Sequence, residues 1–329
     1  MTITLAEAKV GLQDKIVQEV IDEFRRGSLL MDALIYDDAV SPGTGGSTLT
    51  YGYMRTKTPA FAQFRAINSD YTPQEAKREK DSVDLKIFGG SFQIDRVLAN
   101  SSSKAIDEIT YQMQEKVKGA INLFHYSVIN GDSDSDNEFD GLDKILLGTA
   151  TEYNKGESNA VDLSTTEKLD QNYQLFLDKL DEFISSLDGK PTMLMGNTKL
   201  ITKIKSIARR AGYYSKSEDA FGRKVDKYDE IPLVDLGNFV KNNGGSAQTI
   251  PCVPIETRGD VTGLTDLYAI NISLDGFHGV TLDGGNMITT NVPDLTGAGT
   301  VKKGDVEMVA AVALKNSNKA GVFRNIKVG

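Results

Sequence analysis

An uninterrupted amphipathic run of nearly thirty residues, from about 103 to 130, constrains the fold of this 329-residue chain more than any other feature. Its apolar side chains recur every three or four residues, which is the spacing of one helical face: Ile106, Ile109, Met113, Val117, Ala120, Ile121, Phe124 and Val128. Ser101 to Ser103 can cap its start. At 1.5 Å per residue, the run predicts a rod of roughly 40 Å. We interpret His125 within it as a packed structural histidine rather than a ligand.

A long polar connection between two β-rich stretches is the second unusual feature. Residues 49–56 and 82–95 predict strands, the second bent or bulged at Gly89-Gly90. Roughly 25 residues separate them, whereas hairpin loops usually have ~2 to 5. Large apolar side chains interrupt this connection, so we expect it to pack on a neighbouring molecule; a surface loop is the alternative. These side chains are Phe61, Phe64, Ile67 and Tyr71.

The remaining pattern predicts an α+β protein. Residues 4–26 predict a helix with one apolar face, which can pack on its own domain or on another. The residues of this face are Leu5, Leu12, Ile16, Val20 and Phe24. Helices are expected at about 165–187, with a cap at Ser164-Thr165, and after Asn197, which can cap the second helix. An apolar strand lies between them, and we expect this middle part to contain a mixed sheet. From Ile231 onward the chain is rich in strands, and we expect the alternating runs 306–314 and 322–328 to form a β-hairpin packed on the long helix.

The acidic stretch "GDSDSDNEFDG" (131–141) raises the question of a metal or catalytic site. Asp132, Asp134 and Asp136 alternate as in a calcium loop, but Asn137 stands where the tight turn requires glycine, and Asp143 is shorter than the usual closing glutamate. The stretch offers no apolar pocket to raise the pKa of one carboxyl for acid catalysis. We interpret it as a solvated loop that leaves the helix, with Gly131 ending the rod.

Composition gives little support to the common classes of chemistry. One cysteine and two histidines supply neither a disulfide nor a zinc cluster, and nucleotide-binding and hydrolase motifs are missing. No secretion signal or membrane-length apolar run is present, so we expect a soluble protein made in a cytoplasm. The net charge of −9 argues against a dedicated nucleic-acid binder. We therefore predict no catalytic, cofactor or metal residue.

The order of these pieces resembles the major capsid proteins of tailed bacteriophages, which have the Hong Kong 97-type fold. In that family a loop of the form Asn-Gly-Asp followed by Gly-Leu leaves the long spine helix, as "VINGDSDSDNEFDGLDKIL" does at 128–146. The stretches "MLMGNTKLITKI" (193–204), "YDEIPLVDLG" (228–237) and "DLYAINISLDGFHGVTLDGG" (266–285) resemble parts of the family's axial domain. Gly196-Asn197 departs from members that carry an arginine there.

The resemblance implies an amino-terminal arm (1–47), an extended hairpin loop (48–98), a peripheral domain (99–150 and 298–329, with the spine helix at about 103–130) and an axial domain (151–297). It also implies a virion shell of pentamers and hexamers, assembled in the host bacterial cytoplasm around double-stranded DNA that is held by weak non-specific contacts. Scaffolding, portal and possible decoration proteins are the further partners it implies. The candidate inter-subunit contacts are Leu12, Ile16, Val20, Phe24, Lys57, Phe61, Phe64, Arg65, Tyr71, Lys77, Arg78 and Lys80.

Two alternatives remain at this point. An encapsulin-like bacterial nanocompartment would keep the fold and change the cargo, although the long loop at 57–81 favours a virus. A soluble metal-dependent enzyme would use the carboxylates at 132–143.

Overall fold

The computed structural model describes residues 28–38, 49–58, 62–73, 75, 77–95, 103–135, 137–212, 215–218, 224–243, 246–282, 288–294 and 299–329. The helix expected at 4–26 lies outside these residues. Within the described chain, no helix is long and apolar enough to cross a membrane.

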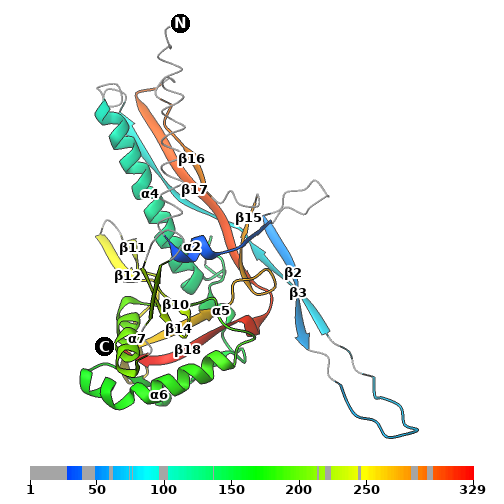
Figure 1. Cartoon of the computed structure of the whole chain (residues 1–329). Helices are drawn as coiled ribbons and strands as arrows, with labels where there is room; N and C mark the ends of the chain where they lie inside the picture. Colours follow the sequence, from blue (N-terminus) through cyan, green and yellow to red (C-terminus); the bar gives the residue numbers. More distant parts are fainter. Residues whose placement is uncertain are drawn as a thin grey trace.

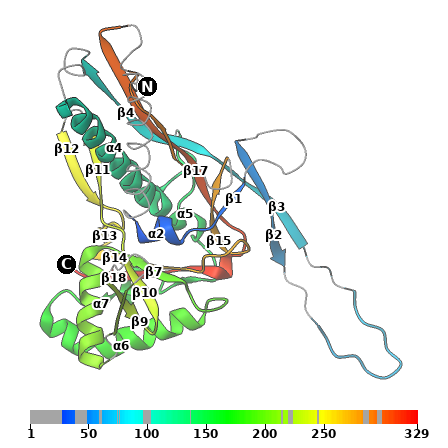
Figure 2. The same ribbon diagram turned by 45° about the horizontal axis from the view of Figure 1, so that its top comes forward.

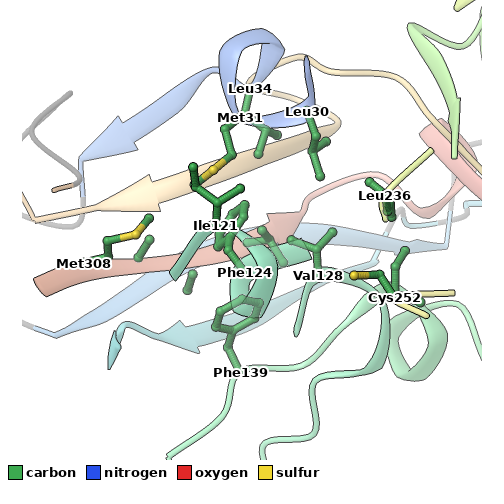
Figure 3. Close-up of a cluster of buried hydrophobic side chains, with 14 of the residues drawn as sticks. Leu30, Met31, Leu34, Ile121, Phe124, Val128, Phe139, Leu236, Cys252 and Met308 are labelled. Atoms are coloured by element: carbon green, nitrogen blue, oxygen red, sulfur yellow. The ribbon is translucent and has the colours of Figure 1, made fainter. Parts of the chain in front are cut away.

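The long helix is confirmed as α4 (Ser103–Asn130), which lies along a five-stranded sheet (Figures 1 and 2). The sheet has the order β1-β15-β17-β16, and β4 pairs with β17 on its other side. Its strands are β1 (Tyr36–Asp38), β4 (Lys86–Asp95), β15 (Phe277–Thr281), β16 (Ile288–Asn291) and β17 (Val301–Leu314). The apolar stripe of α4 is buried from Ile109 to Val128, and Figure 3 shows Phe124 in this cluster with Met308 and Phe139.

A nine-stranded sheet forms the other half of the molecule, in the order β5-β18-β14-β7-β10-β9-β8, with β13 on β14 and β6 on β18. Its strand β7 pairs in parallel with β10 and antiparallel with β14, as a mixed sheet was expected to do. The strands are β5 (Glu152–Tyr153), β6 (Val161–Asp162), β7 (Met193–Gly196), β8 (Ser215–Glu218), β9 (Lys224–Tyr228), β10 (Ile231–Asp235), β13 (Glu256–Arg258), β14 (Val261–Ile270) and β18 (Ala320–Lys327).

The central strands of this sheet are buried on both faces. Leu194 and Leu267 contribute to a core beneath α6 (Thr166–Ser185) and α7 (Thr198–Ala211), whereas Met195 and Tyr268 contribute to the core that contains α4. Both helices begin at predicted caps, because Thr165 Oγ1 accepts from Lys168 N and Asn197 Oδ1 accepts from Leu200 N. The two hydrophobic cores thus share one sheet.

Shorter elements complete the chain. The helices are α2 (Leu29–Ala33) and α5 (Leu142–Ile145), with 3-10 turns at Glu157–Asn159 and Ser317–Lys319. Two-stranded sheets pair β2 (Thr50–Thr58) with β3 (Lys77–Asp84), and β11 (Asn238–Asn243) with β12 (Ser246–Pro251). The division into an arm, an extended loop and two domains remains a prediction.

The predicted carboxy-terminal β-hairpin is wrong. Its two strands exist as β17 and β18, but β17 pairs with β4, β15 and β16, while β18 pairs with β14, β5 and β6. The α4 helix does cover β17, as expected. Alternating apolar residues show which face of a strand is buried and carry no information about which strand lies beside it.

The predicted bulge at Gly89-Gly90 is also wrong. β4 pairs with β17 without a register shift from Lys86 to Asp95. Gly89 allows β4 and β17 to approach closely, because a Cβ at this position would lie 2.0 Å from the carbonyl oxygen of Val306. The strand is interrupted at Leu85, between β3 and β4, and β3 begins already at Lys77. The strand pair β2–β3 is therefore longer, and its connection shorter, than the sequence predicted.

Candidate assembly interface

The β2–β3 hairpin projects from the rest of the molecule (Figures 1 and 2). Its strands are in register from Thr50 opposite Asp84 to Thr56 opposite Arg78. Because directly opposite residues share a face of a strand pair, the outer half of the hairpin has two unlike faces. One carries Met54 opposite Lys80, with Arg78 next along β3; the other carries Arg55 opposite Glu79 and Tyr53 opposite Asp81. One face is therefore basic, and the other carries one arginine and two carboxylates.

The connection at the tip exposes large apolar side chains. Phe64 and Ile67 are 106% and 92% exposed, and Tyr71 is 59% exposed. The tip nevertheless has local order, since Arg65 donates to Ser69 O and its guanidinium lies 5.4 Å from the centre of the Tyr71 ring. No described residue of the same chain covers Phe64 or Ile67, and exposed apolar residues gathered at a projecting tip are typical of an interaction site.

A partly buried polar cluster anchors the base of the hairpin. Tyr51 is buried and its hydroxyl donates to Asp37 at 2.5 Å. Lys315 Nζ lies 3.5 Å from Asp37 and 5.3 Å from the centre of the Tyr51 ring, and His278 packs edge-on to the same ring. Burial, and then the hydrogen bond to Asp37, raise the pKa of Tyr51. Burial lowers the pKa of His278.

The candidate contacts predicted from the sequence fall into three groups. Arg65, Lys77, Arg78 and Lys80 are exposed on the hairpin or its tip together with Phe64 and Tyr71. Lys57 lies on β2, without a described side chain. Leu12, Ile16, Val20, Phe24 and Phe61 lie outside the described residues. Seven of the twelve candidates thus belong to the hairpin and its tip, and the side chains of six of them are described.

The side-chain ammonium group of Lys144 lies among the carboxylates of the acidic loop that follows α4. Lys144 Nζ lies 2.6 Å from Asp132, 2.9 Å from Asp134 and 2.9 Å from Asp140. The hydrogen bonds that Lys144 donates to these carboxylates, Asp132 first, raise its pKa. The hydrogen bond from Lys144 in turn lowers the pKa of Asp132. Among the described residues, no group of three or more histidine, cysteine or acidic side chains is placed to hold a metal ion.

The loop begins and ends on two glycines that meet. Gly131 follows the last residue of α4, as predicted, and its carbonyl oxygen accepts from Gly141 N at 2.8 Å. A Cβ on Gly131 would lie 2.2 Å from the carbonyl oxygen of Phe139. Asp143, the residue that would close a calcium loop, instead accepts from the hydroxyl of Tyr268.

Sequence reasoning missed a buried ionic network around Arg324. Its guanidinium contacts Asp143 and lies 2.9 Å from Asp266 and 3.1 Å from Glu152. Arg258 holds the same Asp266 with two hydrogen bonds of 2.7 Å. Burial opposes the charge of Arg324, but Asp266 and its other partners outweigh burial and raise its pKa. Asp143 and Arg324 are 181 residues apart, and no local pattern connects them.

Comparison with known proteins identifies the fold. No family model matches the chain, and no curated protein sequence matches it. Solved structures do match. The SrpI encapsulin of Synechococcus elongatus PCC 7942, in its holo complex, has 13% identity and a TM-score of 0.58 over 91% of this chain and 87% of that chain. The protein of Mycobacterium phage Bobi has 11% identity and a TM-score of 0.55 over 92% and 91%.

A third match is the capsid of a native GTA particle, with 9% identity and a TM-score of 0.52 over 92% of this chain and 90% of that chain. These three matches, an encapsulin, a phage protein and a capsid, each span nearly the whole chain. The chain therefore has the fold of shell-forming proteins. That fold is the Hong Kong 97-type fold, as the resemblance implied.

Proposed function

We propose that this chain is the major capsid protein of a tailed double-stranded DNA bacteriophage, which assembles through pentamers and hexamers into an icosahedral shell. The observation that carries the proposal is the projecting hairpin, whose apolar tip residues Phe64 and Ile67 have no cover within the described chain. An exposed apolar projection on a fold shared with capsid proteins is suited to burial against a neighbouring copy.

The role proposed for the chain is geometric rather than catalytic. The partners are other copies of the same chain, with scaffolding, portal and possible decoration proteins during assembly in the host cytoplasm. The net charge of −9 suits a wall that encloses DNA through weak contacts, because the 46 acidic residues outnumber the 37 lysines and arginines that could neutralise phosphates and release their counterions.

An encapsulin-like shell is the second candidate, and the match to the SrpI encapsulin favours it. The two candidates differ in cargo. Particles purified from the native source should contain double-stranded DNA if the chain is a phage capsid protein, whereas a protein cargo without nucleic acid would contradict the phage proposal. Absorbance at 260 and 280 nm and nuclease-resistant DNA in the particles measure the difference.

The hairpin tip provides the direct test of assembly. Phe64→Ser with Ile67→Ser should leave the unfolding free energy of the isolated chain within about 0.5 kcal/mol, because both side chains are exposed, and should reduce shell formation at least tenfold. Negative-stain microscopy and sedimentation measure the shells. The control Leu147→Ser with Leu274→Ser changes two exposed leucines outside the hairpin, 69% and 49% exposed, and should assemble normally. Normal shells from the tip variant would contradict the proposal.

A further inference from the structure

An acidic groove lies between the carboxy-terminal half of α6 and the turn that joins β9 to β10. It has a volume of about 690 Å³ and is lined by the half-buried apolar side chains of Leu177 and Ile184 and by four carboxylates. The carboxylates are Asp178, Asp181, Asp229 and Glu230. The Tyr228 hydroxyl donates to Asp181, and Lys190 is the cation that pairs with Asp229 and Glu230 at its rim. The four carboxylates outnumber this one cation.

The two carboxylates of the turn belong to residues whose backbone conformation is unfavourable for their residue types. Asp229 and Glu230 both have positive φ, 44° and 64°, in a two-residue hairpin turn where Asn and Gly are the preferred residues. Their side chains are 71% and 89% exposed. Packing within the chain does not explain the choice of these residues, because neither side chain is buried.

A surface of opposite charge runs along α7. This helix carries five basic residues and no acidic one. At about 100° of rotation per residue, Lys199, Lys203 and Arg210 lie within about 40° of one another around the helix and Arg209 lies about 80° to one side of Lys199, so all four share one face of the helix. Lys199 and Arg209 are exposed, Lys203 donates to the carbonyl oxygen of Ser164, and Arg210 pairs with Asp170 at 3.0 Å. We call these four residues the basic stripe.

The basic stripe and the acidic groove do not face each other within one chain. The pair Arg210–Asp170 places the end of α7 beside the first half of α6. The groove begins at Asp178, eight residues later (178 − 170), which corresponds to about 12 Å along the helix at 1.5 Å per residue. The two surfaces therefore lie at different ends of α6, on a molecule whose proposed function requires rings of identical copies.

We propose that the basic stripe of one copy seats in the acidic groove of the next copy, head to tail around each ring. This inference rests on the proposed shell-forming function and assigns the surfaces that make the contact. Complementary charge on two different surfaces gives a heterologous contact, which closes into rings when the rotation between copies closes. The apolar side chains of Leu177 and Ile184 in the groove can pack against the methylene groups of the lysine and arginine side chains.

Charge reversal tests the contact. Asp178→Lys with Glu230→Lys reverses the groove, and Lys199→Glu with Arg209→Glu reverses the stripe. Each variant alone should lower ring and shell formation at least tenfold, while the chain carrying all four changes should assemble like the parent. Asp260→Lys with Glu108→Lys makes the same charge change as the groove variant at exposed sites elsewhere and should assemble normally. Thermal melting of each unassembled chain verifies that it folds.

Mixing the two reversed variants gives a more specific result. A groove-reversed copy then has two basic surfaces and a stripe-reversed copy has two acidic ones, so the two kinds must alternate around a ring. Alternation closes with six members and fails with five. An equimolar mixture should therefore form hexamers without pentamers, and hence no closed shells. Native mass spectrometry of the rings measures both species.

A disulfide trap tests the same contact without requiring shells. The one native cysteine, Cys252, is buried, so Glu230→Cys and Arg209→Cys introduce the exposed thiols. The chain with both changes should form a ladder of linear and cyclic oligomers on oxidation, and an equimolar mixture of the two single variants should form heterodimers. Dimers formed by either single variant alone would instead indicate a like-with-like contact and overturn the proposal.

The outcomes separate this inference from the proposed function. Normal shells from both reversed variants would overturn the head-to-tail contact and leave the capsid proposal intact. Shells of the stripe-reversed variant that have lost their DNA would assign the stripe to nucleic acid and also overturn the contact. A parent chain that forms neither rings nor shells, and no disulfide ladder, would contradict both.

Discussion

A single histidine joins three segments that are distant in the sequence. Ser28 Oγ donates to His125 Nε2 at 2.5 Å, and Nδ1 donates to the carbonyl oxygen of Leu236 at 3.1 Å. Ser28 also caps α2 by accepting from Met31 N. Burial lowers the pKa of His125 from 6.5 to about 4. The folded chain therefore holds this histidine in its neutral form.

This depressed pKa predicts acid sensitivity. Between pH 6.5 and 4 the unfolded chain binds a proton at His125 that the folded chain does not, so stability is complete above about pH 6.5 and falls as the pH decreases. The full difference corresponds to about 3 kcal/mol. The free energy of unfolding, measured in urea, should fall less between pH 7 and pH 4 for His125→Gln than for the parent chain. The difference between the two decreases should be about 3 kcal/mol. Equal losses in parent and variant would contradict the assignment.

Replacing the single residue Arg324 should also change the free energy of unfolding. Arg324→Met removes one of the two guanidinium groups that hold Asp266, whose side chain is 3% exposed. Leaving a buried carboxylate with one partner should lower the unfolding free energy by about 3 kcal/mol. Lys118→Met breaks the exposed pair with Glu115 and should change it by less than about 0.5 kcal/mol. Urea unfolding at pH 7 compares the two, and similar small losses would show that the network contributes little.

The helices α6 and α7 begin with caps of the same kind in different surroundings. Thr165 is exposed and accepts one hydrogen bond, whereas Asn197 is buried and also donates to Thr265 Oγ1 and to the carbonyl oxygen of Val253. Thr165→Ala should cost about 1 kcal/mol. Asn197→Ala should cost about 3 kcal/mol, because it also leaves buried acceptors without a donor. Equal losses in chemical unfolding would show that the additional bonds of Asn197 are weak.

Element by element, prediction from the sequence succeeded where the deciding interaction is local. The period of the apolar residues and the caps at Thr165 and Asn197 placed α4, α6 and α7 close to their observed bounds. Strand pairing depends on partners far away in the sequence, and β17 and β18 were therefore placed in a hairpin that does not exist.

At the candidate interface, too, features that depend on local sequence could be predicted and features that depend on distant residues could not. Phe64, Arg65 and Tyr71 could be found because large side chains in a polar connection stand out. The acidic groove could not be found, since it combines α6 with a turn some 50 residues later. The Arg324 network likewise depends on contacts that form only after both sheets are complete.

At the scale of the whole molecule, two cores on one sheet predict cooperative unfolding. Neighbouring residues of β14, such as Leu267 and Tyr268, belong to different cores. Neither core can be lost while the other keeps its central strands. Calorimetry of the unassembled chain should therefore show one transition, with a calorimetric enthalpy equal to the van't Hoff enthalpy. Two resolved transitions would indicate that the halves are independent.

The position of β17 and β18 has a consequence for synthesis. β17 lies between β4 and its other partners in one sheet, and β18 lies between β14 and β5 in the other, yet both belong to the last residues of the chain. During synthesis, each sheet lacks this central strand until residues 301–327 have left the ribosome, and until then neither core can close.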